Sequence, residues 1–280
     1  MTQTMQQQPP VLVLGGTGKV GRRVATRLTA RGVPVRIGAR TAAPAFDWTD
    51  PATWREVLAG TQSVFISYAP DIAVPGAPQA VAAFTELAAA QGVTRVVLLS
   101  GRGEQEAEAA ERLVQDAPPS WTILRCSRFA QNFSEAFLLD PVLGGEVALP
   151  ADTVTEPFVD CDDIAEVATE ALLDDRHAGH LYELTGPRLM TFSDAIGEIA
   201  RAAERPIRFT TIPPEEFAAG LAAAGLSRDE VSLVSYLFAT VLDGRNSSVR
   251  NGVERALGRP PRDFADYIRQ TAKTGIWRSS

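Results

Sequence analysis

The residues of this chain that most clearly indicate chemistry are the glycines after its first apolar run. A buried strand is predicted over residues 11–14, and the next seven residues are Gly15, Gly16, Thr17, Gly18, Lys19, Val20 and Gly21. They fit the spacing G-x-G-x-x-G from Gly16 and equally the spacing G-x-x-G-x-x-G from Gly15. In both cases the glycines allow a sharp turn close to a pyrophosphate, and the N–H groups of the following helix start face the anion. The segment therefore predicts a dinucleotide-binding turn.

The end of the second predicted strand, residues 33–40, indicates which dinucleotide would bind. A carboxylate there suits a ribose 2′-hydroxyl, whereas a cation suits a 2′-phosphate. The strand ends in Arg40, and no acidic residue comes before Asp47. This favours NADP(H) over NAD(H), with Arg40 as the phosphate clamp, although an exposed arginine needs no such reason. Three more cations are candidate helpers at the same edge: Arg36, Lys19 and Arg22.

Composition is typical of a cytoplasmic, enzyme-sized globule. The 280 residues are 45% hydrophobic and carry a net charge of −7, and no basic tract interleaved with aromatic residues argues for nucleic acid. The polar segment 1–10 lacks the cationic start and apolar core of a signal peptide, and no apolar run has the length of a membrane span. Cys126 and Cys161 form no Cys-x-x-Cys pair, so we interpret both as reduced core residues.

Strand and helix patterns alternate along the chain. This predicts an α/β fold, a doubly wound parallel sheet of the Rossmann type, with a smaller, mostly helical C-terminal substrate lobe. The expected nucleotide-binding core covers residues 9–150 and is completed by strands within 156–186. The expected lobe covers 187–275, with a contribution from 131–155. Predicted strands cover 63–67, 95–100, 121–125, 158–159 and 180–186, and predicted helices cover 51–59, 78–91, 104–115 and 229–242.

Several segments together resemble the NmrA-like group of atypical short-chain dehydrogenase/reductases, close to the NAD(P)H:quinone and azo-dye reductases. They are the glycine turn, Val35-Arg36 with Arg40, Asp47-Trp48-Thr49-Asp50-Pro51, Val96-Val97-Leu98-Leu99-Ser100, Thr122-Ile123-Leu124-Arg125 with Phe129 and Asn132-Phe133, and Tyr182-Glu183-Leu184-Thr185-Gly186-Pro187. The resemblance spans nearly the whole chain. It implies that Asp47 meets the adenine edge and that Trp48 also binds the cofactor. It further implies that the segment from Ser67 through Tyr68 and Ala69 to Pro70 flanks the ribose and pyrophosphate, and that Ser100 and Gly101 lie beside the nicotinamide.

The chain lacks the general acid that ordinary members of the larger superfamily use. Ordinary members use a serine at the end of this strand and a Tyr-x-x-x-Lys motif on the next helix, where the tyrosine protonates a reduced carbonyl. Ser100 is present, but residues 104–115 contain neither Tyr nor Lys, and Lys19 and Lys273 are the only lysines of the chain. An electron-poor acceptor such as a quinone tolerates this loss because its product oxyanion is delocalised.

Other candidate residues carry weaker patterns. Asn132 follows a buried strand, and the resemblance puts it near the nicotinamide pocket, so Ser100 and Asn132 are the candidate catalytic or positioning residues. Tyr68 and Tyr182 fit packing better than catalysis. His177 and His180 lack a third ligand, so no metal site is predicted. The acidic residues Glu156, Asp160, Asp162 and Asp163 are interpreted as a helix cap within a solvated cluster.

The sequence therefore predicts an NADPH-dependent oxidoreductase that delivers hydride to a small molecule. Two alternatives stay open: a non-catalytic NADP(H) sensor that binds a protein partner, and an isomerase or cyclase without redox turnover. The expected partner is a small-molecule substrate rather than nucleic acid or a membrane. A homodimer is compatible with the sequence.

Overall fold

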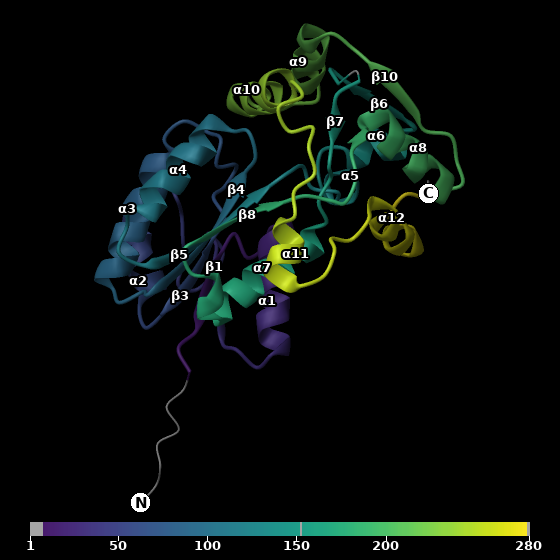
Figure 1. Cartoon of the computed structure of the whole chain (residues 1–280). Coiled ribbons are helices and arrows are strands. Elements are labelled where there is room, and N and C mark those ends of the chain that lie inside the picture. Colours follow the sequence, from purple (N-terminus) through teal and green to yellow (C-terminus); the bar gives the residue numbers. More distant parts are fainter. Residues whose placement is uncertain (1–7, 152, 279–280) are drawn as a thin grey trace, which may run out of the picture. The chain divides into compact units, whose positions relative to one another are not determined.

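The computed structural model describes residues 8–151 and 153–278 (Figure 1). The chain divides into two compact units, and each is described by itself. Unit 1 comprises the chain up to Gly101 together with Gln105–Arg125 and Ile164–Tyr182. Unit 2 comprises Arg102–Glu104, Cys126–Asp163 and the chain from Glu183 onward.

A six-stranded sheet in the order β2-β1-β3-β4-β5-β8 organises unit 1. Its strands are β1 Val11–Leu14, β2 Val35–Gly38, β3 Ser63–Ile66, β4 Arg95–Gly101, β5 Ser120–Cys126 and β8 His180–Leu184. Strand β1 pairs in parallel with β2 on one side and with β3 on the other, and β3 pairs in parallel with β4. The chain thus reverses its direction across the sheet at β1, and such switch points are where doubly wound sheets bind ligands. The predicted Rossmann fold is confirmed.

Helices alternate with these strands, as predicted. They are α1 Lys19–Ala30, the 3-10 turn η1 Pro51–Thr53, α2 Trp54–Leu58, α3 Ala77–Ala90, α4 Gln105–Gln115, α7 Cys161–Leu173 and the 3-10 turn η2 Asp175–His177. Helix α1 is typical of the set because it buries Val20, Val24 and Leu28 on one stripe and exposes its charged residues.

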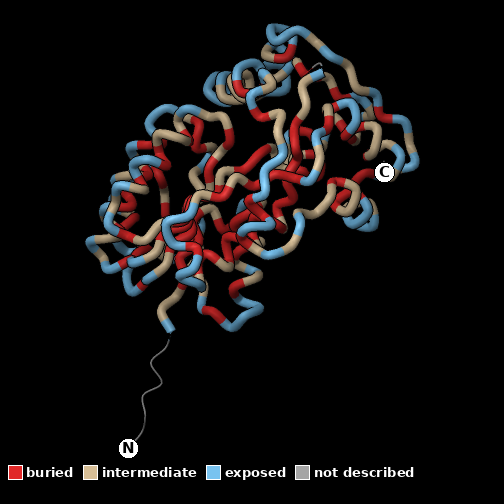
Figure 2. The backbone as a smooth tube through the Cα atoms, viewed as in Figure 1, coloured by how far each residue is buried: buried red, intermediate tan, exposed pale blue. Residues whose placement is uncertain are grey.

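The central strands β1 and β3 are nearly continuous apolar runs, as expected for parallel strands covered on both faces. Figure 2 shows the buried stretches of the backbone in red. Strand β1 is buried throughout, and Val64, Phe65 and Ile66 of β3 are fully inaccessible. An aromatic cluster of Phe46, Trp48, Trp54 and Phe84 packs in the same core, with ring centroids 5.0–6.4 Å apart. This packing fixes the loop that follows β2.

Unit 2 contains short helices and two small sheets. The elements are α5 Asn132–Glu135, α6 Leu139–Gly144, β6 Glu146–Leu149, β7 Thr155–Glu156, β9 Met190–Thr191, α8 Phe192–Ala202, β10 Arg208–Thr211, α9 Pro214–Ala223, α10 Arg228–Tyr236, the π-helical turn η3 Leu237–Val241, α11 Gly252–Leu257 and α12 Phe264–Lys273. Strands β6 and β10 pair in parallel, and β7 pairs with β9 in antiparallel fashion. A second hydrophobic cluster around Phe133, Phe158 and Phe192 forms its core.

Three details of the sequence interpretation are wrong in unit 2. The strand expected at residues 158–159 is reduced to a single bridge between Val159 and Phe129, and β7 lies just before it. The helix expected over 229–242 is α10 followed by the π-helical turn. The paired strands β6 and β10 were not predicted at all, because their four-residue segments carry too few apolar positions for a period to show.

The acidic cluster is also not solvated as expected. Asp160 is buried and accepts hydrogen bonds from Gln131 and from the N–H of Asp162, so the capping part of the interpretation holds. Asp163 is fully buried and pairs with Arg259 and Arg262. These ion pairs explain how a carboxylate can lie in the core.

Within residues 8–151 and 153–278, no helix combines the length and apolarity that a membrane crossing requires.

Candidate functional site

The glycine turn joins β1 to α1, and two of its glycines are required by geometry. Gly15 has a φ of 65°, in the left-handed region that favours glycine. A Cβ on Gly21 would lie 2.2 Å from the carbonyl oxygen of Gly15, so no larger residue fits where α1 crosses the turn. The N–H of Gly18 donates to the Gly15 carbonyl at 2.9 Å, which closes the turn.

Helix α1 begins directly after this turn. Its N-cap, Gly18, supplies no side-chain cap to the first turn, and that turn contains no acidic residue. The backbone N–H groups at a helix start and its positive dipole end suit an anion, so the turn is a ready cradle for phosphate. Of the other predicted turn residues, Gly16 packs against Ile37, Lys19 is the first residue of α1, and Val20 is buried.

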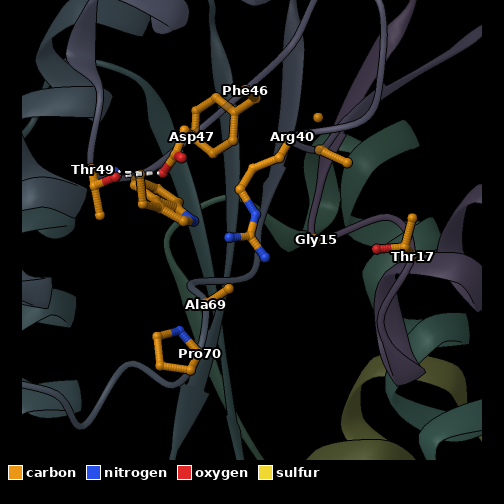
Figure 3. Close-up of a pocket in the computed structure, with 11 residues that line it drawn as sticks. Gly15, Thr17, Arg40, Phe46, Asp47, Thr49, Ala69 and Pro70 are labelled. Atoms are coloured by element: carbon orange, nitrogen blue, oxygen red, sulfur yellow. Dashed lines mark hydrogen bonds between the residues drawn. The ribbon is translucent and has the colours of Figure 1, made fainter. Parts of the chain in front are cut away.

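A pocket of about 420 Å³ opens beside the turn in unit 1 (Figure 3). Seven of its lining residues were predicted to lie at the cofactor: Gly15, Thr17, Arg40, Asp47, Trp48, Ala69 and Pro70. Four more were not: Gly38, Ala39, Phe46 and Thr49. The first three of these come from the end of β2 and its loop, and their small or apolar types carry no signal for phosphate or adenine in the sequence.

Arg40 reaches into this pocket. Its guanidinium lies between the loop carrying Asp47 and the segment of Ala69 and Pro70, on the side of Gly15 (Figure 3). Arg40 is itself exposed, so the cation is accessible to a ligand. Arg36, a candidate helper, is engaged elsewhere because its guanidinium donates to the carbonyls of Val57 and Ala59 at 2.8 and 2.6 Å. The helper role expected for Arg36 is therefore wrong.

Asp47 stands across the pocket as an anchored carboxylate. Its Oδ1 accepts hydrogen bonds from the N–H and the hydroxyl of Thr49 at 2.9 and 2.8 Å (Figure 3). These hydrogen bonds, aided by the nearby charge of Arg40, lower the pKa of Asp47 below its ordinary value. The same pocket is therefore lined by an anchored carboxylate, Asp47, and by the Arg40 cation.

Aromatic and small side chains complete the pocket's surroundings. The rings of Trp48 and Tyr68 lie 4.7 Å apart, and burial raises the pKa of the Tyr68 hydroxyl. Ser67 packs against Gly15, because a Cβ at that glycine would lie 3.0 Å from the Ser67 Cβ. The structure therefore brings Ser67 to the turn and Tyr68 to Trp48, and their roles at the cofactor stay predictions.

Ser100 and Gly101 are the last two residues of β4, at the same carboxyl edge of the sheet. Ser100 is buried, and its hydroxyl donates to Glu111 Oε1 at 2.5 Å. Arg125 of β5 holds the same carboxylate, donating from Nε to Oε1 at 3.0 Å and from Nη2 to Oε2. Glu111 is 2% exposed, so the three side chains form a buried hydrogen-bonded network.

The sequence hypothesis missed Glu111, although a signal for it exists. In α4 the buried stripe contains Ala107, Ala110 and Val114, and Glu111 shares that stripe at helical spacing. A carboxylate on the apolar face of a helix needs a partner, since an unpaired buried charge is costly. Arg125 is that partner.

Asn132 lies in unit 2, where it opens α5 and is half-buried. Its backbone N–H donates to the carbonyl of Phe129 at 3.1 Å. The neighbouring Gln131 is buried and bridges Asp160 and the N–H of Cys161. This contact fixes the start of α5, and the pocket role of Asn132 stays a prediction.

The remaining candidates serve packing. Tyr182 is buried, and its hydroxyl lies 3.0 Å from Nδ1 of His177, which is also buried. Burial lowers the pKa of His177. Cys126 and Cys161 are buried thiols of the core, as expected. Among the residues that the structure describes, no group of three His, Cys, Asp or Glu side chains could hold a metal ion.

Comparisons with known proteins identify the family of this chain. The model of a family described as NAD(P)H-binding matches residues 15–175. A Bacillus subtilis (strain 168) protein called an uncharacterized oxidoreductase, YesF, is 30% identical over 98% of this chain and 99% of its own length.

Two solved structures share the fold over nearly their whole lengths. The Escherichia coli NADPH-dependent quinone oxidoreductase QOR2, complexed with NADPH, has a TM-score of 0.73 at 19% identity, covering 93% of this chain and 99% of its own. The negative transcriptional regulator NmrA, complexed with NAD, has a TM-score of 0.66 at 13% identity, covering 97% of both chains. The chain belongs to the NAD(P)H-binding family, and its fold resembles that of NmrA, as the resemblance to the NmrA-like atypical short-chain dehydrogenase/reductases implies.

Proposed function

We propose that this protein is an NADPH-dependent oxidoreductase that transfers hydride to a quinone-like or similarly electron-poor small molecule. The observation that carries the proposal is the position of Arg40, whose guanidinium enters a pocket bordered by the glycine turn. Membership of an NAD(P)H-binding family supports the cofactor class, and the arginine supports its phosphorylated form.

The cofactor preference follows from the charges in the pocket. A guanidinium presents N–H donors that match phosphate oxygens, whereas a ribose hydroxyl is best held by a carboxylate. Asp47 is anchored on Thr49 and borders the same pocket, which suits the adenine edge better than the 2′-position that Arg40 would hold. A Cβ on Gly21 would meet the turn itself and a Cβ on Gly15 would meet Ser67, so both glycines keep the turn tight enough to cradle a pyrophosphate.

The acceptor class follows from what α4 lacks. The bound cofactor would supply the hydride, and this chain's residues would bind and orient the two reactants. Helix α4 contains neither Tyr nor Lys, so a tyrosine acid supported by lysine is absent from it. An acceptor whose reduced form is a delocalised anion needs no such acid, because water can protonate it later. QOR2, a quinone oxidoreductase with the same fold, acts on an acceptor of this kind.

The proposed roles of single residues are positional. Ser100 and Gly101 would lie beside the nicotinamide, and Asn132 of unit 2 would orient the nicotinamide or the acceptor. The turn residues Gly16, Gly18, Lys19 and Val20 would hold the pyrophosphate through their backbone, and Ser67, Tyr68 and Ala69 would flank the ribose. The lobe expected over 187–275 would supply the acceptor site.

A steady-state assay tests the proposal. The purified protein is mixed with NADPH and a panel of simple quinones, and loss of the reduced-nicotinamide absorbance is followed. We expect NADPH oxidation that depends on both the protein and the quinone. Tight NADPH binding without turnover across a broad acceptor panel would instead indicate a nucleotide sensor. A protein that binds no pyridine nucleotide would contradict both functions.

A further inference from the structure

The network of Ser100, Glu111 and Arg125 fixes the direction of its hydrogen bonds. A guanidinium has only donors, and Arg125 directs two of them at the two oxygens of Glu111. Both carboxylate oxygens therefore act as acceptors, as in a fork-to-fork ion pair. The short contact between Ser100 and Glu111 Oε1 must then use the proton of the serine hydroxyl.

Because the Ser100 hydroxyl proton is donated to Glu111, only the lone pairs of the Ser100 oxygen are available to a ligand. A free serine hydroxyl rotates and can donate or accept as needed. Ser100 is 3% exposed and its proton points to a carboxylate that is 2% exposed, so breaking the bond would leave a buried charge with one donor fewer. Ser100 is thus a built acceptor at the carboxyl end of β4.

We propose that Ser100 accepts a hydrogen bond from an N–H group of the bound ligand, and that Glu111 is the positioning residue that imposes this polarity. The inference rests on the proposed function, under which Ser100 lies beside the nicotinamide. The carboxamide is the only part of the nicotinamide that carries N–H donors, so the carboxamide NH₂ is the group that Ser100 recognises. Ser100 consequently does not donate to the oxygen of a reduced acceptor, the role that an oxyanion-stabilising serine would have.

A cofactor analogue isolates this single contact. The 3-acetylpyridine analogue of NADP keeps the carbonyl and replaces NH₂ with a methyl group. Calorimetry measures the Kd of NADP and of the analogue for the wild type and for Ser100→Ala. We expect the wild type to prefer NADP by about tenfold and Ser100→Ala to lose most of that preference, in line with one buried hydrogen bond. Ser127→Ala is the matched control, because Ser127 is equally buried and its hydroxyl donates to the Pro157 carbonyl.

A second variant tests the positioning role of Glu111. Glu111→Leu removes the acceptor and frees the serine proton, while Arg125, whose side chain is 23% exposed, can reach water. We expect Glu111→Leu to reduce the preference for NADP severalfold, and we expect Ser100→Ala to cause no further loss in that background. Should Glu111→Leu fail to fold, the Ser100→Ala comparison still decides the proposal.

The outcomes separate this inference from the proposed function. If the wild type reduces quinones but Ser100→Ala weakens NADP and the analogue equally, the acceptor role is wrong and the oxidoreductase stands. If Ser100→Ala instead lowers kcat about 100-fold with an unchanged NADP preference, Ser100 is a donor to the reacting oxygen and the inference is overturned. Failure of the wild type to bind NADP at all would overturn both.

Discussion

The two parts of the carboxyl edge of the sheet in unit 1 are built in opposite ways. At the end of β2, the pocket presents an exposed arginine and a turn made of backbone. At the end of β4, Ser100 is buried and bonded through Glu111 to Arg125. The first arrangement, an exposed cation beside a backbone turn, suits reversible binding of a charged ligand. The second suits one hydroxyl held in one orientation.

The buried network should show the largest response to mutation. Arg125→Ala removes the partner of a buried carboxylate, so we expect the free energy of unfolding to fall by about 3 kcal/mol or more. Chemical denaturation of the variant and the wild type measures this loss. The double variant Glu111→Leu with Arg125→Met removes both charges and should recover most of it. If Arg125→Ala has the same unfolding midpoint in denaturant as the wild type, the ion pair between Glu111 and Arg125 does not stabilise the fold.

The glycine turn should respond next, through cofactor binding and stability together. In Gly21→Ala, a Cβ 2.2 Å from the Gly15 carbonyl oxygen forces the turn and α1 apart. We expect about 1–3 kcal/mol of lost stability and a loss of NADPH affinity of at least tenfold. Gly220→Ala is the control, because Gly220 lies in α9 with open space around its Cβ position. A Gly21→Ala protein with native affinity would mean that the nucleotide binds elsewhere.

The smallest expected effect is that of salt, which should weaken binding at the exposed Arg40 and have little effect on the buried network. Charges near the surface are screened at high ionic strength, whereas a buried pair is screened much less. Raising the salt to about 1 M should therefore weaken NADPH binding several times more than NADH binding, because only NADPH carries the phosphate that Arg40 would hold. Titrations of both nucleotides at low and high salt measure the difference. Identical salt slopes for the two nucleotides would argue against an exposed arginine clamp.

The pocket and the buried network also differ in how well the sequence predicts them. The turn and Arg40 depend on local spacing after a buried strand, so the fold and seven of the eleven pocket residues could be predicted. The network could not be predicted in full. The apolar stripe of α4 indicates that Glu111 needs a partner, but only the tertiary fold shows that the partner is Arg125 of β5. The engagement of Arg36 with α2 and the burial of Asp163 were mispredicted for the same reason, since both depend on tertiary partners.

The central claim, an arginine clamp on a 2′-phosphate, is tested most directly by the affinities of Arg40→Ala for NADPH and NADH. Calorimetry on the wild type, on Arg40→Ala and on Arg36→Ala, whose guanidinium is bonded to α2, gives the comparison. We expect Arg40→Ala to lose about 10- to 100-fold in NADPH affinity and about twofold or less in NADH affinity, with Arg36→Ala showing no such preference. Equal losses for both nucleotides in Arg40→Ala would contradict the account.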